Sequence, residues 1–126
     1  GYDPILQIVN NPKLSIIQQD IRNISNTSVK GQDVIFHLAG ISGMPACASN
    51  PDSAENINVG STEKLVNLLD KNQLLINAST TSFYGAGGEE CDETVEAQPV
   101  SIYGKTKLAA EKILINLCEN VDITEL

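Results

Sequence analysis

Residues 33–43, Asp33–Val34–Ile35–Phe36–His37–Leu38–Ala39–Gly40–Ile41–Ser42–Gly43, decide the fold of this chain. The first seven are largely apolar and rich in β-branched and aromatic side chains, which is typical of a strand buried on both faces. Strands of that kind occur in parallel sheets covered by helices. The small residues that follow would let a flat ligand approach the backbone. We therefore predict a parallel sheet with a ligand site at its carboxyl edge.

Helix and strand patterns alternate on both sides of this run. At Asn50–Pro51–Asp52, for example, a proline suited to a first helical turn and an aspartate that complements the helix dipole predict a helix start. The predicted elements are, in order, the end of a helix over 3–11, a short strand over 14–18, a short helix within 23–32, the strand over 33–39, a helix from 51 to about 69, a strand over 73–78, an exposed loop over 85–100, a helix over 101–119 and a strand from 121. This alternation predicts an α/β fold, a parallel sheet with flanking helices.

The size and charge of the chain limit its function. Its 126 residues suffice for one domain with a core, and a hydrophobic content of 41% is ordinary for a globular protein. A net charge of −8 argues against partners such as nucleic acid or an anionic membrane. No apolar stretch is long enough to span a membrane. The start, Gly1–Tyr2–Asp3–Pro4, is unlike a signal peptide, so we expect a cytoplasmic protein.

The cysteines and the single histidine have structural interpretations. Cys47, Cys91 and Cys118 are odd in number and widely spaced, which fits neither a zinc site nor a disulfide framework. We expect ordinary buried or half-buried thiols and no metal. His37 lies inside the strand run, where a hydrogen-bonded core histidine is more common than a catalytic one.

Tyr103 and Lys107 form the first candidate catalytic pair. They are four residues apart at the start of a predicted helix, so they lie on one face, one turn apart. A neighbouring ammonium favours the phenolate and lowers the tyrosine pKa from its usual value of about 10. Tyr103 is therefore a candidate for proton transfer near neutral pH. The same spacing also occurs between ordinary surface neighbours on helices.

Polar or small residues follow each of the first three predicted strands. The segment Asp20–Ile21 follows the first strand, Ala39–Gly43 the second, and a hydroxyl cluster, Ser79 to Ser82, the third. A row of hydroxyls at a strand end could also be a polar turn. Together with the Tyr103/Lys107 helix, however, it would place a hydroxyl, a phenol and an ammonium around one substrate oxygen.

In these segments the chain resembles the extended short-chain dehydrogenase/reductases, the NAD-dependent nucleotide-sugar epimerase/dehydratase family that includes UDP-galactose 4-epimerase. The resemblance runs from about Leu14 to Leu117. It rests on Asp20–Ile21–Arg22–Asn23, His37–Leu38–Ala39–Gly40, Asn50–Pro51, Asn58–Val59, Ala78–Ser79–Thr80–Thr81–Ser82–Phe83–Tyr84–Gly85 and Pro99–Val100–Ser101–Ile102–Tyr103–Gly104–Lys105–Thr106–Lys107. Several matches in the right order and spacing make this resemblance specific.

The resemblance implies NAD as cofactor, a nucleotide sugar as substrate and hydride transfer through a keto-sugar intermediate. It implies that Tyr103 takes the proton of a sugar hydroxyl, that Lys107 lowers the tyrosine pKa and binds the nicotinamide ribose, and that Thr80 positions the reacting oxygen. The cofactor-binding residues that it implies are Asp20, Ile21, Leu38, Ala39, Gly40, Asn58, Tyr103 and Lys107.

The chain departs from the family pattern in several places. The glycine-rich turn for the pyrophosphate, the first two strands and the sugar-nucleotide domain are not found among residues 1–126. We therefore expect residues 1–126 to be part of one incomplete Rossmann-like NAD-binding domain, with no second domain, and to be inactive alone. Thr81–Ser82 stands where dehydratases carry acidic residues, and Ser42 where glucuronate epimerases carry an arginine. Both departures argue against those branches.

Two further interpretations stay open from the sequence. The chain could be a catalytically silent nucleotide-binding or scaffold member of the same fold, or an inactive fragment. The presence of Tyr103, Thr80 and Lys107 favours the enzyme. The helices near 51–69 and 101–119 carry wide apolar surfaces, and the resemblance implies a homodimer through them. Both surfaces could instead belong entirely to the core.

Overall fold

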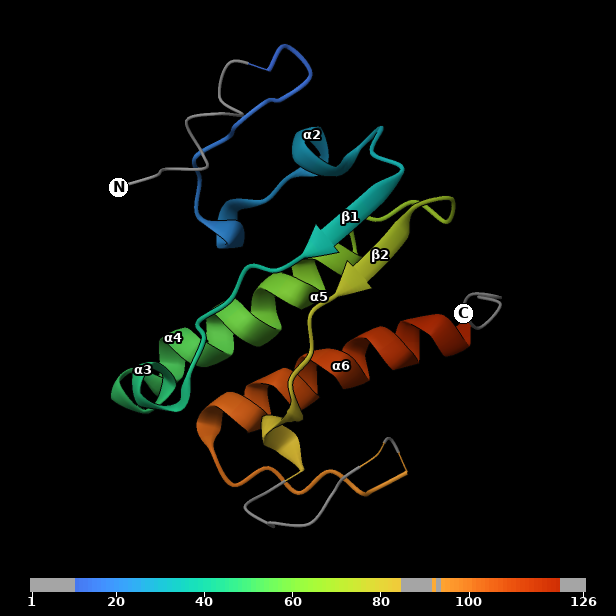
Figure 1. Cartoon of the computed structure of the whole chain (residues 1–126). Coiled ribbons are helices and arrows are strands. Elements are labelled where there is room, and N and C mark those ends of the chain that lie inside the picture. The colour runs from blue at the N-terminus through green and yellow to red at the C-terminus, as the bar shows by residue number, and fades with distance from the viewer. Residues whose placement is uncertain (1–10, 85–91, 93, 121–126) are drawn as a thin grey trace.

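The computed structural model describes residues 11–84, 92 and 94–120, and Figure 1 shows the arrangement of their elements. The elements, in chain order, are the 3-10 turn η1 (Ile21–Asn23), α2 (Asn26–Val29), β1 (Val34–His37), α3 (Met44–Ser49), α4 (Pro51–Glu55), the π-helical segment η2 (Asn56–Gly60), α5 (Ser61–Val66), β2 (Leu74–Asn77), the 3-10 turn η3 (Thr81–Phe83) and α6 (Ile102–Asn120). β1 and β2 pair in parallel, with Val34 opposite Leu74 and His37 opposite Asn77. The predicted α/β fold with a parallel sheet is confirmed.

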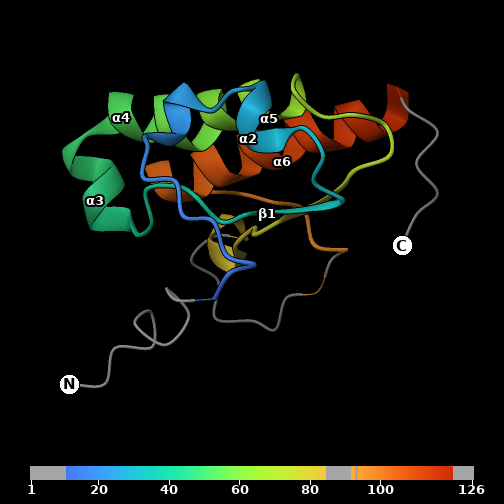
Figure 2. The same ribbon diagram turned by 90° about the horizontal axis from the view of Figure 1, so that it is seen from above.

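The helices form one layer over one face of the sheet. Figure 2 shows α2, α4, α5 and α6 together on the same side of β1. The helices also pack against one another, with α6 in contact with α3, α4 and α5. The fully buried apolar residues all lie on helices; they are Val29, Cys47, Ala54, Leu65 and Ala110. Ile35 and His37 of β1 alternate with exposed neighbours, as one-sided burial requires.

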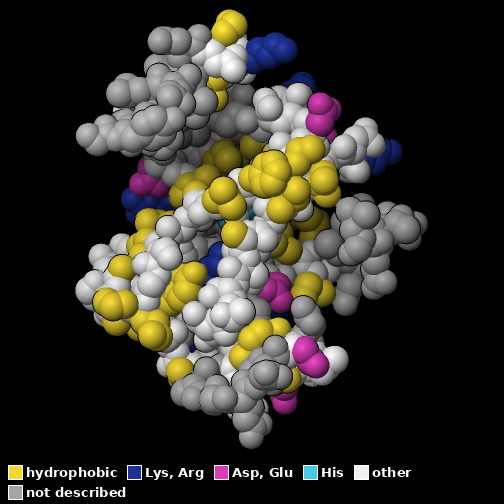
Figure 3. Space-filling model, in the orientation of Figure 1, with side chains coloured by type: hydrophobic (Ala, Val, Ile, Leu, Met, Phe, Trp, Pro, Cys, Tyr) yellow, Lys and Arg dark blue, Asp and Glu magenta, His cyan; other side chains and the backbone are white. Residues whose placement is uncertain are grey.

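The other face of the sheet is open within the described residues. Phe36 is 64% exposed and Leu38 71%. Figure 3 shows apolar side chains gathered over the two strands on this face; the exposed ones are Val34, Phe36, Leu38, Leu74 and Ile76. The prediction that β1 is buried on both faces is therefore wrong for this structure. The physical reason is that every described helix that covers the sheet packs on its opposite face.

Several predicted elements agree with the structure and one does not. The strand at 74–77, the short helix at 26–29 and the helix at 102–120 are confirmed. The strand predicted over 14–18 is absent, and Ile16 and Ile17 are more than 60% exposed, because no described segment pairs with it. The expected helix at 3–11, apart from residue 11, and the expected strand from 121 lie outside the described residues, as do 85–91 and 93 of the expected loop. The rest of that loop, 92 and 94–100, contains no helix or strand, as predicted.

The helix predicted from 51 to about 69 is a run from 51 to 66 with a π-helical interior. Asn50 caps it, because its Oδ1 accepts a hydrogen bond from the Ser53 N–H at 3.0 Å. Helix α3 was not predicted, although Gly43, at φ +89°, and a proline in the first turn mark its start. No helix in the described part of the chain is both long enough and apolar enough to cross a membrane.

Candidate active site

The hydroxyl segment Ser79–Ser82 begins two residues after β2, at the carboxyl edge of the sheet. Thr80 is half-buried and extended, with φ −155° and ψ 150°, and it caps η3. Its Oγ1 accepts a hydrogen bond from the Ser82 N–H at 3.1 Å and donates one to Ser82 Oγ at 3.1 Å. The segment is therefore a folded turn with a fixed Thr80 hydroxyl, and the interpretation as a polar turn holds for its local geometry.

Gly104 lets this turn lie directly against α6. A Cβ atom at Gly104 would lie 2.8 Å from the backbone oxygen of Ser82 and 3.2 Å from Pro99 Cβ, so only glycine fits without a shift. The Gly104 N–H donates to Ser101 Oγ at 3.0 Å, which satisfies a free donor in the first turn of the helix. Gly104 follows Tyr103 directly, so this contact places the hydroxyl turn beside the start of the Tyr103 helix.

Lys107 joins the same helix to the end of β2. Tyr103 and Lys107 are both half-buried on α6 and lie one turn apart. The Lys107 ammonium donates a hydrogen bond to the backbone oxygen of Ala78. That bond uses one of the three N–H donors of the ammonium, which leaves two for a ligand.

Asn58 ties the loop after β1 to α6. It is 4% exposed; its Oδ1 accepts from the Ile41 N–H at 2.7 Å, and its Nδ2 donates to Ile41 O at 3.1 Å and to Thr106 Oγ1 at 3.0 Å. Thr106 Oγ1 in turn donates to the backbone oxygen of Tyr103 at 3.0 Å. Both N–H donors of the Asn58 amide have partners within the chain, so Asn58 links the loop after β1 to α6. A Cβ at Gly40 would lie 3.0 Å from Asn58 Oδ1, a tight contact that favours glycine there.

His37 belongs to the core network behind the site. It is 6% exposed, and its Nε2 lies 2.9 Å from Thr62 Oγ1. Because the Thr62 hydroxyl donates its proton to Asn58 O at 2.8 Å, His37 Nε2 is the donor in that pair. Burial and, secondly, the charge of Lys107 lower the pKa of His37 below its usual range. The imidazole is therefore neutral, and the interpretation as a satisfied core histidine is confirmed.

Cys47 is the one cysteine whose side chain the structure describes, and it is a free thiol. Cys47 is fully buried, and burial raises the pKa of its thiol, as expected for a structural cysteine. Its Sγ lies 3.5 Å from Ile41 O, in the same loop that Asn58 holds. Cys91 and the side chain of Cys118 lie outside the described residues.

The segments expected to hold the adenosine end of NAD are exposed. Asp20 caps η1: its Oδ1 accepts from the Arg22 N–H at 2.9 Å, and its Oδ2 forms an ion pair with Arg22 Nη2 at 2.6 Å. The hydrogen bond from the Arg22 side chain, followed by that from its backbone, lowers the pKa of Asp20 to about 2. Ile21 is half-buried, while Leu38, Ala39 and Gly40 are exposed after β1.

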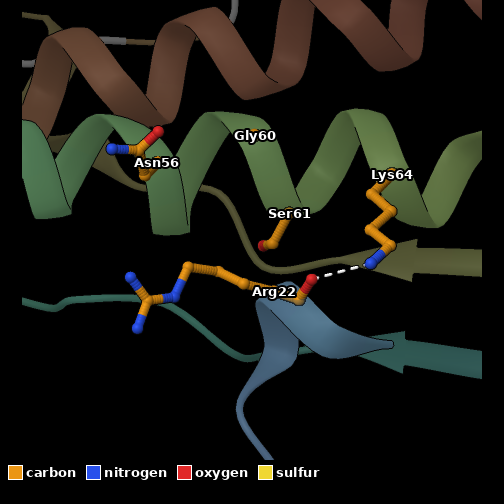
Figure 4. A pocket seen from close by; sticks show the side chains of 5 residues that line it. All are labelled: Arg22, Asn56, Gly60, Ser61 and Lys64. Carbon is orange, nitrogen blue, oxygen red and sulfur yellow. Dashed lines mark hydrogen bonds between the residues drawn. The ribbon is translucent and has the colours of Figure 1, made fainter. Parts of the chain in front are cut away.

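An open hollow of about 370 Å³ lies between η1 and the helix that carries Asn58, as Figure 4 shows. Its lining residues are Arg22, Asn56, Gly60, Ser61 and Lys64. Lys64 Nζ donates to Arg22 O at 2.7 Å, Arg22 pairs with Asp20, and Ser61 Oγ donates to Ile57 O at 2.5 Å. Because the polar groups of Lys64, Arg22 and Ser61 already have partners in the chain, we interpret the hollow as part of the packing interface between η1 and α5.

A comparison with protein families identifies the family of the chain. The model of the NAD dependent epimerase/dehydratase family matches residues 6–124, which is nearly the whole chain. The chain belongs to this family. The resemblance predicted from the short segments around Asp20, Thr80 and Tyr103 is thereby confirmed.

Two of the relatives are named as UDP-glucose epimerases. The chain is 37% identical over 90 residues to the uncharacterized UDP-glucose epimerase YtcB of Bacillus subtilis, a match that covers 68% of this chain and 28% of the relative. It is 29% identical over 111 residues to the UDP-glucose 4-epimerase of Rickettsia bellii, covering 85% of this chain and 29% of that protein.

A solved structure agrees with the fold. UDP-glucuronic acid 4-epimerase from Bacillus cereus, in complex with UDP-glucuronic acid and NAD, superposes with a TM-score of 0.85 at 28% identity. The match covers 94% of this chain and 39% of that one. The chain thus spans about 30–40% of the length of the family members that it matches.

The structure connects some of the predicted site residues of this family member and separates others. It joins the Thr80 turn to the helix of Tyr103 and Lys107, and it ties Asn58 to that helix through Thr106. Asp20 and Ile21 lie on η1, which packs against η2 and α5 instead. Sequence reasoning missed Gly104 and Thr106. A glycine and a β-branched hydroxyl residue inside a helix are unfavourable by propensity, and that was the available signal.

Proposed function

We propose that this chain forms the central part of an NAD-dependent enzyme that epimerises or reduces a nucleotide sugar by hydride transfer through a keto-sugar intermediate. The observation that carries the proposal is the contact of Gly104 with Ser82 O, which sets a hydroxyl turn beside the start of the Tyr103/Lys107 helix. Relatives named as UDP-glucose 4-epimerases support the reaction class, and the neighbour solved with NAD supports the cofactor.

The residues at the carboxyl edge suit the predicted cofactor. The backbone of 38–40 is exposed and its glycine is fixed against Asn58, the Asp20 carboxylate is exposed and ionised, and the Lys107 ammonium has N–H donors to offer. Asp20, Ile21, Leu38, Ala39 and Gly40 would hold the adenosine end, with Asn58 as their support. Lys107 would bind the nicotinamide ribose beside Tyr103. NAD, when bound, supplies a hydride acceptor and donor.

In this proposal, side chains of the chain itself carry out the proton transfer. In our proposal Tyr103 takes the proton of the sugar hydroxyl as the carbon beside it is oxidised, and gives the proton back when that carbon is reduced. The Thr80 hydroxyl, which donates to Ser82 Oγ in this structure, would turn its one proton to the same sugar oxygen and position that oxygen.

The test of this proposal uses the complete protein that contains this chain. We expect it to bind NAD and to interconvert a UDP-sugar such as UDP-glucose with its epimer, in a screen that also includes GDP-, CDP- and dTDP-sugars. Lys107→Met should lower both NAD affinity and turnover, while Lys105→Met, an exposed lysine of the same helix, should leave them unchanged. A complete protein that binds NAD without acting on any nucleotide sugar would instead support the silent scaffold.

We further propose that the complete protein is a cytoplasmic homodimer with the helices near 51–69 and 101–119 at the interface, which are the run α4–η2–α5 and α6. The location is the one expected from the sequence. The dimer is supported by apolar side chains that the core does not fully cover, among them Ile115 of α6, which is 48% exposed. Sedimentation of the complete protein should give a dimer, and Ile115→Glu should shift it towards monomer. A monomeric wild type would contradict the dimer.

A further inference from the structure

The two residues before Thr80 form hydrogen bonds with side chains of α6 that lie one helical turn apart. Lys107 donates to the backbone oxygen of Ala78. Ser79 Oγ donates to Glu111 Oε2 at 2.5 Å, a short hydrogen bond to a carboxylate. Tyr103, Lys107 and Glu111 follow one another at intervals of four residues, so they line one face of the helix.

Thr80 lies between these two hydrogen bonds and a third contact with α6. On its far side, Ser82 O is held against Gly104. The hydrogen bonds of the Thr80 side chain itself go to Ser82, inside its own turn. The position of the Thr80 hydroxyl relative to Tyr103 is therefore set by the contacts of its neighbours with α6, at Ala78, Ser79 and Ser82.

From this geometry we propose that Glu111 is a positioning residue of the active site: its hydrogen bond with Ser79 holds Thr80 in register with Tyr103. The inference rests on the proposed function and adds to it a residue that touches neither substrate nor cofactor. Glu111 is suited to this task because it is half-buried and reaches Ser79 from the turn of α6 that follows Lys107.

The expected effect is on turnover. Misplacement of a reacting group by about 1 Å can cost about 100-fold in rate. Loss of the Ser79–Glu111 bond frees one of three contacts, so we expect kcat to fall by about 10- to 100-fold. The substrate KM should change less than about twofold, because ground-state binding does not depend on this bond. Glu111→Gln keeps an acceptor oxygen and should restore most of the rate that Glu111→Leu loses.

The experiment is a double-mutant cycle in the complete protein. Ser79→Ala, Glu111→Leu and the double variant are compared for kcat, KM and free energy of unfolding, with Glu63→Leu, an exposed helical glutamate, as the matched control. If the two side chains act through one bond, the double variant is no slower than the slower single variant. A purely structural role would couple the two residues in stability but leave kcat unchanged.

The outcomes distinguish a failure of the proposed role of Glu111 from a failure of the proposed function. An active wild type in which Glu111→Leu keeps full kcat, or in which the two variants lower kcat additively, overturns the role of Glu111 and leaves the proposed function standing. A wild type that interconverts no nucleotide sugar overturns both. A non-additive loss of kcat, recovered in Glu111→Gln, supports the inference.

Discussion

Gly104→Ala tests whether the hydroxyl turn is packed as tightly against α6 as the structure shows. The new Cβ would meet Ser82 O at 2.8 Å, and that atom belongs to the backbone and cannot rotate away. To reach an ordinary contact of about 3.4 Å, the turn must retreat by about 0.6 Å. Overpacking of this kind costs about 1–3 kcal/mol.

The matched control for this substitution is Gly60→Ala. Gly60 is helical, with φ −61° and ψ −36°, and a Cβ there would have no neighbour within 4 Å. Both substitutions gain the helix propensity of alanine, worth about 1 kcal/mol, so their difference isolates the packing cost at Gly104. We expect Gly60→Ala to stabilise the protein and Gly104→Ala to be less stable than Gly60→Ala by about 1–3 kcal/mol.

The assay is urea unfolding of the complete protein with each substitution, together with kcat. Because Ser82 carries the hydrogen bonds of Thr80, retreat of the turn should also lower kcat in Gly104→Ala and not in Gly60→Ala. Equal shifts in unfolding free energy for the two variants, with unchanged turnover, would refute the tight contact and the placement of Thr80 that follows from it.

Two further predictions concern the network behind the site. Asn58→Leu should destabilise the protein by about 2–4 kcal/mol, because it leaves the Ile41 N–H without its acceptor and removes a hydrogen bond from Ile41 O and from the Thr106 hydroxyl. Exposed Asn56→Leu should stay within about 0.5 kcal/mol in the same unfolding measurement. Equal effects of the two substitutions would contradict these contacts of Asn58. The pKa of His37 is lower in the folded protein than its unfolded value of about 6.5, so its contribution to stability is fully present above that pH and declines as the pH falls towards the folded pKa. Unfolding free energies at about pH 7.5 and 5.5 should therefore differ less in His37→Gln than in the wild type, and an unchanged difference would show that other groups cause the acid dependence.

The elements that could be predicted from sequence are those whose signal is local. The apolar run at 34–37, the proline and aspartate after Asn50 and the apolar spacing of 102–117 each specify their own structure, and all three elements form. The segment 14–18 has an equally apolar strand pattern, yet it forms no strand, because a strand exists only through its pairing partner. The open face of β1 could not be predicted for the same reason: burial depends on what packs there.

The site was predictable in its residue types but not in its connections. Tyr103, Lys107 and Thr80 stand out through chemistry and spacing, and the resemblance to a family assigned their roles. The bond from Asn58 to Thr106 spans 48 residues, and that from Ser79 to Glu111 spans 32. Contacts at such separations depend on how α6 crosses the end of the sheet, which no local pattern specifies. The π-helical segment that carries Asn58 also has no sequence signal that we recognise.

The turnover of Tyr103→Phe in the complete protein, with its nucleotide sugar and with NAD bound, tests the role of Tyr103 in proton transfer. The substitution removes one oxygen from a half-buried side chain, so the fold and the NAD content should be retained. We expect kcat to fall by about 10²–10⁴-fold, the range typical of a lost general acid–base group. Undiminished turnover would contradict the assignment of Tyr103, and with it the hydride-transfer chemistry proposed for this edge of the sheet.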